Sequence, residues 1–138
     1  MNQAAAFPAA VKAAVKQEGE GGVNLVDYNP GGILPSEMLF FVALCKSQGV
    51  DLIVESGRKR GFSTEVLARS FPTTEIVSIE RRPRTDLDKR FDSYDNVQLI
   101  TGDAETELAR ISSRFHYRRA ALLVDGPKDD AAFDLAFP

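Results

Sequence analysis

The chain has 138 residues, of which 43% are hydrophobic and 27% are charged, and its formal net charge is −3. This length is typical of one compact domain with a buried core. The slight negative charge gives no global positive field, so we do not expect bulk attraction to nucleic acid or to an anionic membrane. The sequence has no run of about eighteen apolar residues and no secretory signal, which predicts a soluble cytoplasmic protein.

The single cysteine, Cys45, lies in the apolar run that begins at Met38. This setting predicts a small buried hydrophobe rather than a nucleophile or a metal ligand. One cysteine cannot form an intrachain disulfide, which fits a reducing compartment.

The start of the chain precedes the regular part of the sequence. Residues 2–17 are rich in alanine and have valines at helical spacing, which predicts a weakly amphipathic helix at the periphery. Glycines and prolines predict a loop after it. Ser36 is then expected to cap a helix that runs to about Gln48 and ends at Gly49.

The rest of the chain alternates short apolar runs with helical segments. The runs are rich in Val, Ile and Leu without polar alternation, which is typical of parallel strands covered on both faces. Right-handed crossovers between such strands give a Rossmann-like, doubly wound α/β sheet. The predicted strands are residues 51–55, 75–80, 97–100 and 120–124, and the predicted helices between them are residues 63–71, 86–91 and 104–113.

We therefore divide the chain into an N-terminal helix and loop, residues 1–34, and one α/β domain, residues 35–138. The chain stops soon after the fourth predicted strand. A doubly wound domain normally carries more strands, so this strand would present a long apolar edge. We favour a fragment that is incomplete at its C-terminus. The alternative is an oligomer in which another subunit covers the edge.

An acidic side chain stands at or just after the end of each predicted strand, namely Glu55, Glu80, Asp103 and Asp125. The carboxyl ends of parallel strands meet at the ligand crevice of an open α/β sheet, so these acids are expected to converge and repel one another. A positively charged or hydroxyl-rich ligand would relieve that repulsion.

The segment from Glu55 to Thr64 reads Glu-Ser-Gly-Arg-Lys-Arg-Gly-Phe-Ser-Thr. It resembles the first motif of class I S-adenosylmethionine-dependent methyltransferases, in the form acid, any residue, Gly, three residues, Gly, any residue, Ser or Thr. That form is familiar from catechol and caffeoyl-coenzyme A type O-methyltransferases. The resemblance spans about residues 30–128, and it departs from the commoner motif, which has a glycine where Lys59 stands.

The resemblance implies an S-adenosylmethionine site on the first strand and its turn. Glu55 and the turn from Gly57 to Gly61 would lie beside the methionine part of the cofactor, with Ser63 at the start of the helix. The glycines would let the backbone approach the ligand, and the helix amides would meet its carboxylate.

The resemblance also assigns roles to the later strand ends. Glu80 would accept the ribose hydroxyls, and Asp103 would lie at the adenine edge with the amide of Ala104 nearby. Asp125 would face the methyl group and a small-molecule substrate. In the catechol type branch an acid at this place binds a divalent metal such as Mg²⁺, so Asp125 is also the candidate metal ligand. Apart from the resemblance, the position of Lys128 just after Asp125 makes it a candidate substrate contact or proton acceptor, although most lysines at such a place are simply exposed.

Two other functions compete with a methyltransferase. A nicotinamide or flavin dinucleotide would suit Glu80 equally well, but the turn lacks the G-x-G-x-x-G spacing and Glu55 would oppose a pyrophosphate. A non-catalytic or degenerate binding and assembly module of the same fold is the alternative from another class.

Two basic segments, residues 58–60 and 81–84, follow the first two strands. They would form a basic rim for an anionic substrate, a phosphate or a nucleic acid, or they are simply solvated loops. We favour solvated loops, and not nucleic acid, because no aromatic residues interleave with the basic ones. Arg58 has Glu55 or Glu80 as alternative partners. His116, the only histidine, is expected on the surface at the end of the sheet opposite the crevice.

Overall fold

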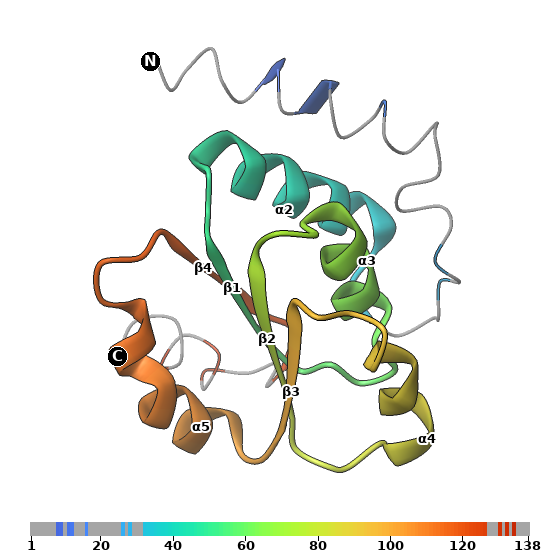
Figure 1. Cartoon of the computed structure of the whole chain (residues 1–138), viewed down its shortest axis with the longest axis vertical. Helices are drawn as coiled ribbons and strands as arrows, with labels where there is room; N and C mark the ends of the chain where they lie inside the picture. Colours follow the sequence, from blue (N-terminus) through green and yellow to red (C-terminus); the bar gives the residue numbers. More distant parts are fainter. Residues whose placement is uncertain are drawn as a thin grey trace.

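The computed structural model describes residues 8, 9, 11, 12, 16, 26, 28, 32–126, 130, 132 and 134. Its centre is a four-stranded parallel sheet in the order β3-β2-β1-β4 (Figure 1). This is the Rossmann-like α/β arrangement that the sequence predicts. The strands are β1 (Leu52–Ser56), β2 (Glu75–Glu80), β3 (Val97–Thr101) and β4 (Ala120–Val124).

Helices cover both faces of this sheet (Figure 1). On one face Ile53 and Ile76 belong to the same buried cluster as Val42 and Leu67. On the other face Val54, Val77 and Ile79 are buried with Leu108 and Ile111. Neighbouring residues of one strand thus enter different cores, which explains the unbroken apolar runs. The helices are α2 (Pro35–Gln48), α3 (Phe62–Ser70), α4 (Thr85–Asp88) and α5 (Ala104–Ile111), with 3-10 turns η2 (Lys89–Phe91) and η3 (Ser112–Phe115).

Helix α2 begins two residues earlier than predicted. Its N-cap is Leu34, so the prediction that Ser36 caps the helix is wrong. Pro35 occupies the first helical position, where its fixed φ suits the helix, and the carboxylate of Glu37 accepts the Leu34 N–H at 2.7 Å. Gly49 ends the helix in the left-handed conformation, as predicted.

The predicted helix over residues 86–91 is divided into α4 and η2. Phe91 at its end is only 3% exposed, and its ring lies against Gly61, where an added Cβ would come within 2.7 Å of Cζ. The tighter 3-10 turn brings Phe91 to that position. The predicted helix over residues 104–113 likewise ends as the 3-10 turn η3.

Most of the predicted N-terminal helix lies outside the described residues. Val11 and Lys12, which are described, are helical, and Val11 packs against the α2–α3 side of the core. Within the described residues, no helix is long and apolar enough to cross a membrane.

Cys45 is 1% exposed, which confirms its prediction as a buried hydrophobe. Burial raises the pKa of its thiol to about 12, so the thiolate is scarce at neutral pH. We expect iodoacetamide at pH 8 to leave the folded protein unmodified for an hour and to alkylate Cys45 fully in guanidinium chloride. Intact-mass spectrometry measures both states. Rapid alkylation of the folded protein would contradict this placement.

Candidate functional site

The site lies where the strand order changes direction, between β1 and β4. β1 pairs with β2 on one side and β4 on the other, so the turns that follow β1 and β4 meet at the carboxyl end of the sheet. The carbonyl of Ser56 accepts the amides of Asp125 at 2.9 Å and Gly126 at 3.1 Å. Such a switch point is where open α/β folds bind ligands.

A cavity of about 420 Å³, here called the main cavity, opens at these strand ends. Its volume is within the usual range for a small-molecule site. A second cavity of about 420 Å³ lies between the amino ends of β2 and β3, at the end of the sheet where open α/β folds do not place ligands. The main cavity is lined by Ser56, Gly57, Lys59, Ile79, Glu80, Arg81, Gly102, Asp103, Ala104, Asp125 and Gly126.

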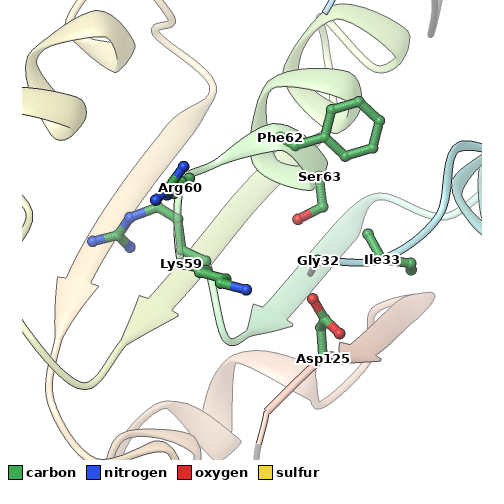
Figure 2. Close-up of a pocket in the computed structure, with 8 residues that line it drawn as sticks. Gly32, Ile33, Lys59, Arg60, Phe62, Ser63 and Asp125 are labelled. Atoms are coloured by element: carbon green, nitrogen blue, oxygen red, sulfur yellow. The ribbon is translucent and has the colours of Figure 1, made fainter. Parts of the chain in front are cut away.

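A smaller cavity of about 20 Å³ adjoins the main cavity (Figure 2). Lys59 and Asp125 line both cavities, so they mark the boundary between them. Figure 2 shows the Asp125 carboxylate pointing from the turn after β4 toward Gly32 and Ser63. Asp125 therefore faces the space between the two cavities.

Glu80 is held in place by backbone amides of both neighbouring turns. Its Oε2 accepts the Lys59 N–H at 2.6 Å, and its Oε1 accepts the Arg82 N–H at 3.4 Å. Lys59 has a φ of +50°, which turns its amide toward Glu80. This left-handed conformation suits glycine best, so the lysine is strained here.

Glu55 lies beneath the turn and not on a cavity wall. It has no exposed surface, and its carboxylate accepts hydrogen bonds from the hydroxyls of Ser63, Thr64 and Ser78. The expected convergence of four acids therefore holds for three of them, because Glu80, Asp103 and Asp125 line the main cavity and Glu55 does not. The side chain of Glu55 instead ties the first turn of α3 and strand β2 to β1.

The two glycines of the turn have different surroundings. Gly57 lines the main cavity with a φ of +97°, and an added Cβ would lie 2.8 Å from the backbone nitrogen of Gly126. Gly61, with a φ of +76°, lines neither cavity, since Phe91 packs against it. Ser63 lines the smaller cavity. The turn is thus packed between β4 on one side and η2 on the other.

The start of α5 forms the part of the main cavity wall where the resemblance places adenine. Asp103 is the N-cap of α5, and its side chain accepts the Thr106 N–H at 3.3 Å. Ala104 is the first residue of the helix and lines the cavity beside it. The positive end of the helix therefore faces the ligand space.

Arg58 has a role that the sequence did not indicate. It is 2% exposed, and its guanidinium contacts Asp88 at 3.0 Å and 3.2 Å and the carbonyl of Ser78 at 2.8 Å. Neither Glu55 nor Glu80 is its partner, and it is not part of an exposed rim. No local signal links residues 30 positions apart, so only the packing of α4 against the turn shows this ion pair.

The remaining sequence predictions concern Lys128, His116 and a metal site. Lys128 lies outside the described residues. His116 is exposed before β4, at the end of the sheet opposite the crevice. Among the described residues, no group of three or more His, Cys, Asp or Glu side chains is arranged to hold a metal ion. Metal binding at Asp125 therefore rests on the resemblance alone.

A scan of protein-family models and a search of curated proteins found no match. A search of solved structures found an O-methyltransferase from Bacillus cereus in complex with SAH, with a TM-score of 0.59 and 22% sequence identity. The match covers 93% of this chain and 60% of that chain. The likeness establishes the fold and leaves about two fifths of the neighbour's length without a counterpart here.

Gly57→Ala is expected to lower the free energy of unfolding by about 2 kcal/mol, because the methyl group would collide with the backbone of Gly126 at an unfavourable φ. Lys59→Gly is the matched control, since it relieves a left-handed conformation and should keep or slightly raise stability. Urea unfolding of both variants measures the difference. Equal stability of Gly57→Ala and the unchanged protein would contradict the close approach of the two turns.

Arg58→Met is expected to lower the free energy of unfolding by about 2 kcal/mol, because it leaves Asp88 and a buried carbonyl without their donor. Arg110→Met removes a surface pair with Glu107 and should cost less than about 0.5 kcal/mol. The same urea measurement compares them. A loss no larger for Arg58→Met than for Arg110→Met would show that the ion pair does not hold α4 against the turn.

Proposed function

We propose that the main cavity binds S-adenosylmethionine and that the chain is a methyltransferase or the cofactor-binding part of one. The observation that carries this proposal is the position of Glu80 at the end of β2, on the wall of a cavity that it shares with Asp103 and Asp125. Ribose hydroxyls, an adenine amine, and an ammonium or sulfonium group are complementary to three acids in this arrangement.

Glu80 is prepared to accept a pair of hydroxyl groups. Each carboxylate oxygen has two lone pairs, and the amides of Lys59 and Arg82 occupy one on each oxygen. One acceptor site therefore remains on each oxygen for a ribose hydroxyl. The two amides also fix the orientation of the carboxylate before the ligand arrives, which lowers the entropy lost on binding.

Asp125 is the residue we assign to the reacting end of the site, because it lines both cavities. When bound, S-adenosylmethionine supplies a methyl group that an acceptor nucleophile takes in line as the carbon–sulfur bond breaks and its electrons stay on sulfur. Asp125 would orient the acceptor and take its proton, while most of the rate enhancement would come from proximity and alignment.

The proposed acceptor atom is oxygen. The solved neighbour is an O-methyltransferase, and the motif from Glu55 to Thr64 has the form found in O-methyltransferases. A carboxylate at Asp125 suits deprotonation of a hydroxyl group whose proton is acidic enough to transfer. Lys128 remains a candidate for the same task because it follows Asp125 closely in the sequence.

A dinucleotide fits this site less well. The turn offers only Gly57 and Gly61, so it lacks the second glycine that lets a backbone approach a pyrophosphate. Asp125 also lines the space beside the turn, where a pyrophosphate would meet its negative charge.

The test is calorimetric titration of the chain with SAH, S-adenosylmethionine and NAD. We expect micromolar binding of the first two and none of NAD. Glu80→Ala is expected to weaken SAH binding about 10- to 100-fold, because two hydrogen bonds to a charged acceptor are lost. Asp95→Ala, which removes an exposed carboxylate at the opposite end of the sheet, is the matched control and should bind normally.

Circular dichroism establishes that each variant is folded before titration. A folded chain that binds neither SAH nor S-adenosylmethionine would overturn the proposal. Binding of NAD in place of SAH would assign the cavity to a dinucleotide instead.

A further inference from the structure

Four arginines, Arg60, Arg81, Arg82 and Arg84, follow β1 and β2 and are here called the cationic rim. All four are exposed. Within the described part of the chain, none of their guanidinium groups makes an ion pair or a hydrogen bond. Like charges gathered on one edge repel one another, so the fold itself gains nothing from this arrangement.

The other arginines of the chain are engaged by the protein. Arg119 donates a hydrogen bond to the carbonyl of Gln48, at the amino end of β4. The rest form ion pairs, and they are Arg58, Arg69, Arg90, Arg110, Arg114 and Arg118. The arginines that have no partner among the described residues therefore follow two of the strands whose ends form the main cavity.

The cationic rim is continuous with the openings of both cavities. Arg81 lines the main cavity and Arg60 lines the smaller one, and Lys59 lies between them on both walls. No described acid forms an ion pair with a rim arginine: Asp88 pairs with the buried Arg58, and Glu80 accepts two backbone amides while keeping its charge inside the main cavity. Positive charge at a cavity mouth concentrates anions there and speeds their entry.

The guanidinium group indicates the ligand chemistry. Its planar fork binds carboxylate and phosphate oxygens two at a time, more specifically than an ammonium group does. Single-stranded nucleic acid would also need aromatic stacking platforms. Of the large exposed apolar side chains of the described residues, Tyr28 lies beside the smaller cavity, with its ring 5.4 Å from that of Phe62, and one such ring is fewer than the row of platforms that successive bases need.

We propose that the cationic rim binds a small, multiply charged anion, and that this anionic group belongs to the methyl acceptor. The second part rests on the function proposed above, whereas binding of the anion does not. Phosphate and carboxylate share the required chemistry.

The experiment measures binding of tripolyphosphate and citrate by calorimetry at low salt and again at 0.5 M NaCl. We expect binding of at least one of them that weakens tenfold or more at high salt. Arg82→Gln/Arg84→Gln is expected to weaken it at least fivefold. The matched control, Arg114→Gln/Arg119→Gln, removes the same charge at the amino end of the sheet, where the two side chains contact Gln98 and Gln48, and should bind as the unchanged protein does.

The relative affinities of the two anions distinguish a phosphate-bearing from a carboxylate-bearing acceptor. No binding of either anion, or equal losses in the two double variants, would overturn the proposal even if SAH binds. Anion binding without SAH binding would support the anion site at the cationic rim and overturn the proposed methyltransferase function. A short RNA that binds through the rim arginines at least a hundredfold more tightly than tripolyphosphate would assign the rim to nucleic acid and overturn the small-anion proposal.

Discussion

Glu55 places a carboxylate in the middle of the sheet, where none of its surface is exposed. A buried charge without donors would be strongly destabilising, and here hydroxyls of Ser63 and Thr64 on α3 and Ser78 on β2 supply them. The same bonds hold the start of α3 and the interior of β2 against β1. The cavity walls depend on these three elements, so a residue that touches no ligand space determines the shape of that space.

The turn above Glu55 is fixed by backbone contacts on two sides. Toward β2, the amides of Gly57 and Arg58 both donate to the carbonyl of Ile79, at 2.9 Å and 3.2 Å. Toward β4, Gly57 packs against Gly126 so closely that a side chain does not fit. A rigid turn of this kind presents its amides and the neighbouring acids in one arrangement, which reduces the cost of ordering them around a ligand.

Acidic and basic side chains lie at different depths around this turn. Acids line the main cavity, Arg58 is buried beside α4 in an ion pair with Asp88, and the cationic rim lies outside. Neighbouring residues of one basic segment thus have opposite roles, since Arg58 supports the fold and Arg60 faces solvent. A ligand with a cationic centre and hydroxyls would fit the inside, and an anion would fit the outside.

The sequence by itself determined the strands, the order of βα units and the glycine stop at Gly49, because these depend on periodicity and conformation within a few residues. It also placed Glu80, Asp103 and Asp125 at one crevice, because parallel strands end at the same edge of a sheet. Only the tertiary structure decided that Glu55 points beneath the turn, that Arg58 pairs with Asp88, and that helix 86–91 divides before Phe91. Each of these depends on contacts between residues far apart in the chain, and such contacts leave no periodic or local signal in the sequence.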